Sequence, residues 1–213
     1  MSNPLVLVNC KAYEQGIGEN VLRVARACEE MGACLAVQAV DVFRVSSQTS
    51  AEVWSQHVDP VGFGSHTGAV LPEAVKQAGA VGTLINHAEK QLSLDEIGAV
   101  VSRCKEVGLR TVVCASSVEV ASQVASFAPD FVALELPELI GGDVSIVSAD
   151  SSVVSEAVTA VSVPVLVGAG VSSHEDLVRS QELGAVGVLL ASAVVKKADD
   201  PLVALRELYS GRT

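Results

Sequence analysis

The chain contains 213 residues, and its 25 acidic against 14 basic side chains give it a formal net charge of −11. A surface this negative repels nucleic acids and anionic lipids, so neither is expected as a partner. The length suits a single domain with a sizeable core, which we expect to span residues 1–213. Hydrophobic residues make up 49% of the chain and aromatic residues only 3%, a composition typical of buried parallel strands covered by helices.

No membrane-spanning segment is expected, because charges, glycines or prolines interrupt every extended apolar stretch. The first nine residues, MSNPLVLVN, have no basic region ahead of an apolar stretch, so we expect no secretory signal and a cytoplasmic location. The acidity fits either an ordinary cytosolic enzyme or one adapted to high salt. The cysteines form no C-x-x-C pair, and we expect buried free thiols without a metal site or disulfide framework: Cys10, Cys28, Cys34, Cys104 and Cys114.

Eight short apolar runs along the chain predict β-strands. The third of them is short and mixed in character. In chain order they are Leu5–Asn9, Leu35–Ala39, Glu52–Gln56, Gly82–Asn86, Thr111–Cys114, Phe131–Glu135, Val165–Gly168 and Gly187–Ala191.

The segments between these runs have the spacing of α-helices. Ahead of the fifth strand, apolar residues recur every three or four positions and so share one helix face. Ser93 with Glu96 predicts a capping box at the start of this helix, and Gly108 predicts its end. Ser172 with Glu175 predicts a second capping box later in the chain.

Strands that alternate with helices indicate an α/β fold with a parallel sheet, either closed as a barrel or open and doubly wound. Two observations favour a closed (β/α)8 barrel. The glycine-rich loop expected after the first strand of an open nucleotide-binding fold is replaced by Asn9-Cys10-Lys11. Polar residues also recur where strands end, and in a barrel those ends converge on one mouth.

These strand ends carry groups with useful chemistry. They are Asn9 and Lys11 after the first strand, His87 and Glu89 after the fourth, Glu135 at the sixth, Gly168-Ala169-Gly170 at the seventh and Ala191-Ser192 at the eighth. The turns after the last two strands match the usual phosphate site of such barrels, where backbone N–H groups bind the anion. The pattern therefore indicates a phosphorylated small molecule and an acid–base pair, with no metal cluster.

Each of these side chains also has a structural interpretation when taken alone. Glu135 could end its strand in a salt bridge, His87 could be an ordinary surface histidine, and Lys11 could be a solvated lysine. The coincidence of all three at strand ends favours a catalytic interpretation.

Seven short strings are spread across essentially the whole chain. They are Asn9-Cys10-Lys11, residues 56–60, residues 64–68, residues 85–89, residues 135–141, Gly168-Ala169-Gly170 and residues 189–192. In order and spacing these strings resemble triosephosphate isomerases, and residues 56–60 and 64–68 look like the compact archaeal branch in particular. The acidity leaves a haloarchaeal source open.

The resemblance implies an eight-stranded parallel TIM barrel that interconverts dihydroxyacetone phosphate and D-glyceraldehyde 3-phosphate, in glycolysis and gluconeogenesis, without a cofactor. It implies that Glu135 is the base, that His87 donates a hydrogen bond to the substrate oxygens, and that Lys11 supplies positive charge. Asn9 would position a substrate oxygen. Glu89 would anchor Lys11 or the turn after the fourth strand.

The resemblance also implies a lid over Pro137–Asp143 that closes on the substrate phosphate and excludes water. Lid residues are Pro137, Gly141 and Gly142, and the expected phosphate contacts are backbone groups near Ile140, Gly170, Ala191 and Ser192. A loop at Gly64–Gly68 is expected to project and to dock beside a neighbour's active site, in a homodimer or homotetramer.

The lid departs from the usual family sequence, because Leu136, Gly142 and Asp143 stand where proline, threonine and glycine are common. Leu136 loosens the front hinge, since the fixed φ of proline is gone. Gly142 removes a hydroxyl that could fasten the closed lid. We predict that Asp143 points to solvent and that the enzyme is active with a weaker grip on its lid.

Two other functions compete with this hypothesis. The first is a barrel aldolase with Lys11 as a Schiff-base nucleophile, although Glu89 and Glu135 nearby would oppose the lowered lysine pKa that it needs. The second is a non-catalytic protein that binds a phosphorylated metabolite. Retention of the four polar site residues together argues against it.

Overall fold

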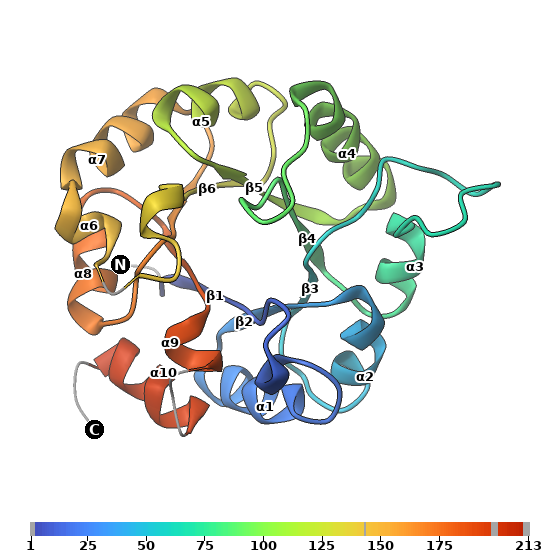
Figure 1. Cartoon of the computed structure of the whole chain (residues 1–213), viewed down its shortest axis with the longest axis horizontal. Helices are drawn as coiled ribbons and strands as arrows, with labels where there is room; N and C mark the ends of the chain where they lie inside the picture. The colour runs from blue at the N-terminus through green and yellow to red at the C-terminus, as the bar shows by residue number, and fades with distance from the viewer. Residues whose placement is uncertain (1–2, 143, 197–199, 211–213) are drawn as a thin grey trace.

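The computed structural model describes residues 3–142, 144–196 and 200–210 as a closed barrel of eight parallel strands (Figure 1). The strands pair in chain order, and β1 also pairs with β8, which closes the sheet. The predicted (β/α)8 architecture is therefore confirmed. The strands are β1 Leu5–Asn9, β2 Cys34–Val37, β3 Val53–Ser55, β4 Gly82–Ile85, β5 Arg110–Ala115, β6 Phe131–Leu134, β7 Val165–Val167 and β8 Gly187–Leu190.

Helices surround the barrel and connect consecutive strands (Figure 1). Within the part of the chain that the structure describes, none of them is long and apolar enough to cross a membrane. The α-helices are α1 Val21–Met31, α2 Val42–Ser46, α3 Pro72–Gln77, α4 Leu94–Val107, α5 Val118–Ala125, α6 Ile146–Ala149, α7 Ser151–Ala160, α8 His174–Glu182, α9 Ser192–Val195 and α10 Pro201–Ser210. Short 3-10 helices are η1 Glu14–Gly16, η2 Ala39–Asp41 and η3 Pro137–Leu139.

Alternation along the strands builds two apolar layers. In β1, Leu7 joins the cluster that fills the barrel, whereas Val6 and Val8 join the cluster between the barrel and the helices. The inner layer also contains the single tryptophan, Trp54, which is fully buried. A Cβ atom at Gly82 would lie 2.4 Å from the Trp54 ring, so glycine on β4 leaves the room that this large side chain needs. These layers hold the strand ends, and thus the mouth of the barrel, rigid.

The predicted boundaries were less accurate than the predicted topology. In the structure β2 begins one residue earlier and ends two residues earlier than predicted, and β3 is shorter. Asn86, Glu135, Gly168 and Ala191 lie one residue beyond their strands. The capping box of Ser93 with Glu96 on α4 is confirmed, and so is the left-handed Gly108 that ends this helix.

The second predicted capping box was wrong by one residue. Ser173 caps α8 and pairs with Asp176, rather than Ser172 with Glu175. The sequence could not distinguish the two pairs, because in both of them the serine precedes the carboxylate by three positions.

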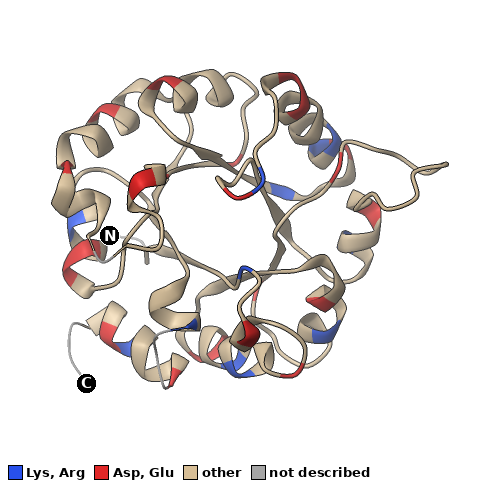
Figure 2. Ribbon diagram, in the orientation of Figure 1, with Lys and Arg blue, Asp and Glu red and all other residues tan. Residues whose placement is uncertain are grey.

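Charged residues lie mainly on the helices and loops around the barrel, while the strands are almost free of them (Figure 2). The segment between β3 and α3 projects from the barrel beside α3, as expected for residues 64–68 (Figure 1). Phe63 at the start of this projection is 77% exposed.

Candidate active site

A pocket opens at the carboxyl ends of the barrel strands, with a volume of about 50 Å3. Side chains at or just beyond the ends of β1, β4 and β6 meet there with the turns after β7 and β8. Of the residues predicted from the sequence, Glu89 and Pro137 do not line the wall of this pocket. Those that do are Asn9, Lys11, His87, Glu135, Ile140, Gly141, Gly142, Gly170, Ala191 and Ser192.

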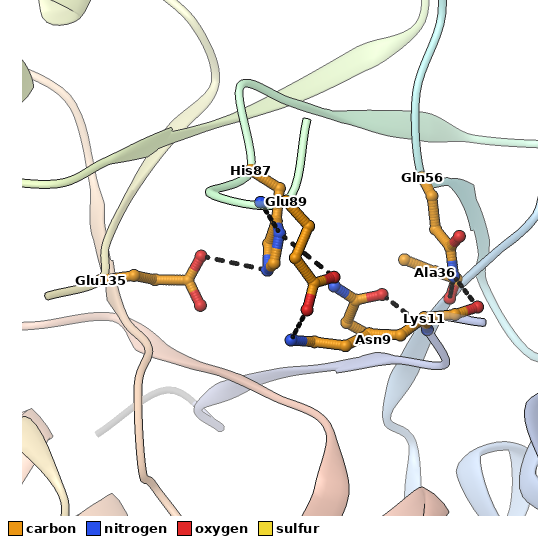
Figure 3. A network of polar contacts seen from close by, with 7 residues as sticks. All are labelled: Asn9, Lys11, Ala36, Gln56, His87, Glu89 and Glu135. Carbon is orange, nitrogen blue, oxygen red and sulfur yellow. Dashed lines mark hydrogen bonds and ion pairs between the residues drawn. The ribbon is translucent and has the colours of Figure 1, made fainter. Parts of the chain in front are cut away.

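The turn after β1 holds Lys11 in a left-handed backbone conformation, with φ at +49°. Such a conformation costs a residue with a side chain about 1–3 kcal/mol unless its surroundings hold it in place. Two hydrogen bonds do so: the Lys11 N–H donates to Asn9 Oδ1 at 3.0 Å, and Gln56 Nε2 donates to the Lys11 carbonyl at 3.0 Å (Figure 3). Asn9 and Gln56 therefore determine the direction in which Lys11 leaves the barrel.

Gln56 was not predicted as a site residue. It follows β3 directly, so its place at a strand end was the signal that could have identified it. Its amide also donates to the Ala36 carbonyl at 3.2 Å, which ties the Lys11 turn to β2. The sequence alone does not distinguish Gln56 from an ordinary polar residue, because its contact with the Lys11 backbone appears only in the folded structure.

The Lys11 ammonium lies 2.7 Å from Oε1 of Glu89. Most of the lysine side chain is buried, but that of Glu89 is 58% exposed, so water screens this ion pair. Such a pair adds little to folding stability, about 0–1 kcal/mol. Its consequence is geometric, because it fixes the end of a long flexible side chain beside the pocket.

The contacts of His87 indicate which ring nitrogen carries the proton. The Glu89 backbone N–H donates to its Nδ1 at 3.2 Å, so Nδ1 accepts and the proton of the neutral ring is assigned to Nε2. This Nε2 lies 3.6 Å from Oε2 of Glu135 (Figure 3). The Glu89 carboxylate is also 3.7 Å from Nδ1. We assign the neutral form, because the shorter contact at Nδ1 comes from a donor.

Glu135 is a buried carboxylate, 6% exposed, and its Oε2 has no hydrogen-bond partner. Burial raises the pKa of this carboxyl above its ordinary value, while His87, a hydrogen bond from Cys114, and Lys11 oppose that rise. The side chain fits only because Gly168 faces it. A Cβ atom at Gly168 would lie 2.4 Å from Glu135 Cγ. The site thus contains a desolvated carboxylate with one free oxygen directed at an imidazole.

The turn after β7 packs against the chain that follows the lid. Gly170 has φ at +73°, and a Cβ atom there would lie 2.1 Å from the Val144 carbonyl oxygen. Ile140 also lines the pocket, and its N–H donates to the Pro137 carbonyl at 3.3 Å within the turn that starts the lid. Asp143, whose side chain we predicted to face solvent, lies outside the described residues.

A buried carboxylate, an imidazole N–H and an ammonium share one pocket with two backbone-rich turns. Among the described residues, no group of three or more His, Cys, Asp or Glu side chains is placed to hold a metal ion. The fold and site define the class of protein as a barrel enzyme that moves a proton on a small anionic substrate.

Comparison with known proteins narrows this class. The sequence profile of the triosephosphate isomerase family matches residues 4–208. Similar curated proteins are the triosephosphate isomerases of Methanosarcina acetivorans, 48% identical with 98% of each chain covered, and of Archaeoglobus fulgidus, 44% identical with 96% of each covered. The crystal structure of triosephosphate isomerase from Bartonella henselae has a TM-score of 0.75 at 18% identity, covers 97% of this chain and 98% of its own, and supports the fold alone. The chain belongs to the triosephosphate isomerase family.

Proposed function

We propose that this chain is a triose-phosphate isomerase, which interconverts dihydroxyacetone phosphate and D-glyceraldehyde 3-phosphate in glycolysis and gluconeogenesis. One observation carries the proposal: the unpartnered Oε2 of buried Glu135 lies 3.6 Å from Nε2 of His87 in a pocket bordered by the turns after β7 and β8. Family membership supports the same reaction.

The first step removes a carbon-bound proton. Glu135 takes a proton from C1 of dihydroxyacetone phosphate, the C–H electron pair forms a double bond between C1 and C2, and the C2 carbonyl becomes an enediolate oxygen. A carboxylate that burial has made more basic suits this transfer. In the second step, the hydroxyl proton on the C1 oxygen moves to the C2 oxygen and protonated Glu135 returns its proton to C2, which leaves an aldehyde at C1 and a hydroxyl at C2.

The reaction requires the formation of a negatively charged enediolate, which must be stabilised. His87 donates its Nε2 hydrogen to the enediolate oxygens, and the Lys11 ammonium supplies positive charge beside them. Asn9 positions a substrate oxygen and holds the Lys11 turn. One preorganised donor of this kind lowers a barrier by about 3–4 kcal/mol.

The phosphate binds to backbone groups near Ile140, Gly170, Ala191 and Ser192, all of which line the pocket. Closure of the lid excludes water and keeps the enediolate from losing its phosphate before it is reprotonated. Leu136 and Gly142 in place of the more common proline and threonine weaken the fastening of this lid, which is expected to lower the rate without abolishing activity.

A coupled isomerase assay with D-glyceraldehyde 3-phosphate tests the proposal. Wild type is expected to be active, and Glu135→Gln is expected to lose about 10³-fold or more in kcat. Glu156→Gln, the same change at an exposed position on α7, is the matched control. An isomerase forms no imine, so borohydride added with substrate should trap no adduct. A trapped adduct on Lys11 would instead identify an aldolase. Wild type without isomerase activity would instead favour a non-catalytic phosphometabolite-binding protein.

The remaining expectations concern the surroundings of the enzyme. We infer a cytoplasmic homodimer or homotetramer in which the projecting loop Gly64–Gly68 contributes to an interface. Phe63 beside that loop is 77% exposed and would be available for an apolar contact in such an interface. The relatives from methanogens and Archaeoglobus support the archaeal type but leave the haloarchaeal origin as a prediction. Activity at low and high salt distinguishes salt adaptation from ordinary acidity.

A further inference from the structure

Asp176, in the first turn of α8, is a buried carboxylate that the proposed reaction does not use. Its side chain accepts hydrogen bonds from three serines of two different loops. Oδ1 accepts from the Ser145 hydroxyl. Oδ2 accepts from the Ser172 and Ser173 backbone N–H groups, both at 3.1 Å, and from the Ser173 hydroxyl at 2.9 Å. Only 8% of Asp176 is exposed, and its bond to Ser145 is buried, whereas its bonds to Ser172 and Ser173 are part-buried.

Ser145 lies directly behind the lid. It is buried and caps α6, where its hydroxyl accepts from the Ser148 N–H at 3.3 Å. The next residue, Ile146, donates its N–H to the Ala169 carbonyl at 3.2 Å, in the turn after β7. The segment that follows the lid, residues 144–146, which we call its rear hinge, is therefore attached to that turn through backbone and side chain together.

Ser172 belongs to the same turn and lines the pocket with Gly170. Its N–H is held by Oδ2 of Asp176, so the carboxylate controls the course of the turn that carries Gly170. The two oxygens of Asp176 thus have separate tasks. One oxygen holds the rear hinge of the lid through Ser145, and the other holds the turn after β7 through Ser172 and Ser173.

We propose that Asp176 is a positioning residue that couples the rear hinge of the lid to the phosphate-binding turn. The inference rests on the proposed function, because it assigns a role in closing the lid over the substrate phosphate. Asparagine does not fully replace this aspartate, since its one neutral oxygen can serve Ser172 and Ser173 but its NH2 group must then donate to Ser145, and the charge-assisted bonds are lost. The coupling acts on substrates that carry a phosphate, because only they draw the lid and the turn together.

A purely structural role would be to cap α8. The Ser173 hydroxyl accepts from the Asp176 N–H at 3.1 Å, and this half of the capping box does not involve Ser145. Loss of helix capping would lower activity equally for every substrate. Loss of the coupling would lower it only for substrates with a phosphate, because binding energy from the phosphate is what closes the lid.

The experiment compares kcat/KM for D-glyceraldehyde 3-phosphate with kcat/KM for D-glyceraldehyde, which lacks the phosphate. Asp176→Asn is expected to lower the first about 10- to 100-fold, as for the loss of a hydrogen bond to a buried charge, and to leave the second within about twofold. Inorganic phosphate released per turnover should rise, because an incompletely closed lid lets the enediolate eliminate its phosphate. Glu175→Gln, the adjacent exposed carboxylate, is the matched control and should change neither substrate.

Ser145→Ala leaves the capping box of α8 in place and keeps the test decisive if Asp176→Asn folds poorly. It should lower kcat/KM for the phosphorylated substrate alone, and the double variant should be no slower than Asp176→Asn. Equal losses for both substrates, or no loss in either single variant, would overturn the coupling. Absence of isomerase activity in wild type and in Glu175→Gln would be a different result, since it would reject the proposed function itself.

Discussion

The sharpest prediction concerns Gly168, which no substrate needs to touch. Its Cα lies so close to the base that an added Cβ atom would be 2.4 Å from Glu135 Cγ, 2.7 Å from Oε1 and 2.9 Å from Cδ. Gly168 does not have positive φ, so alanine at this position causes no backbone strain. Gly168→Ala therefore acts on the glutamate side chain and not on the turn.

The size of the effect follows from these distances. Carbon atoms that do not bond need about 3.5 Å between them, so the Glu135 side chain must move by about 1 Å. A displacement of this size in a reacting group lowers rate about 100-fold. The phosphate turns at Gly170 and Ser192 are untouched, so KM should change little while kcat falls.

Steady-state kinetics of Gly168→Ala, with circular dichroism to verify folding, measure this effect. Gly62→Ala is the matched control, because its new methyl group would meet one atom only, at 3.8 Å, and should leave kcat unchanged. A Gly168→Ala variant with kcat within about threefold of wild type would refute the reasoning, since the position of Glu135 would then not limit the reaction.

Three further predictions concern titration and charge. Folding favours protonated Glu135, because burial raises its pKa, so wild type loses stability as pH rises through that raised value. Glutamine at position 135 does not titrate, so the free energy of unfolding of Glu135→Gln, measured with urea, should exceed that of wild type by about 1–3 kcal/mol at pH 8. The difference should disappear below pH 4.5, the ordinary pKa of glutamate, and an equal difference at both pH values would contradict this. Glu89→Gln frees Lys11 from an exposed ion pair and should raise KM by about 2- to 5-fold, less at high salt; unchanged KM in low salt would show that the pair does not position the lysine. Burial raises the pKa of the Cys10 thiol to about 12, so roughly one thiol in ten thousand is ionised at pH 8 and a disulfide reagent should label it only after denaturation; rapid labelling of folded protein would show that Cys10 is accessible.

The topology and the polar strand ends could be predicted because both depend on local pattern. Apolar runs of strand length alternate with helical spacing, and parallel strands in a barrel bring their carboxyl ends to one mouth. The structure therefore brings together Lys11, His87 and Glu135, which are far apart in sequence. What they do chemically stays a prediction until it is assayed.

The supporting contacts could not be predicted, because each joins residues whose neighbours depend on the closed barrel. Gln56 supports the Lys11 carbonyl across 45 positions of sequence, and Ser145 reaches Asp176 across 31. The spacing of serine and carboxylate was compatible with Ser172 and Glu175 as well as with the observed pair. The course of the chain after β7 determines that Ser173 and Asp176 form the capping box of α8.

The central claim is that Glu135 carries the proton between two carbons of the substrate. Isomerisation in D2O, followed by NMR, tests this most directly, since a protonated carboxylate exchanges with solvent before it returns its proton. Wild type should introduce deuterium at the carbon that receives the proton, and Glu135→Gln should lose both turnover and exchange by about 10³-fold or more while Glu156→Gln retains them. Glu135→Gln that still exchanges and turns over at the wild-type rate would contradict the claim, because another group would then be the base.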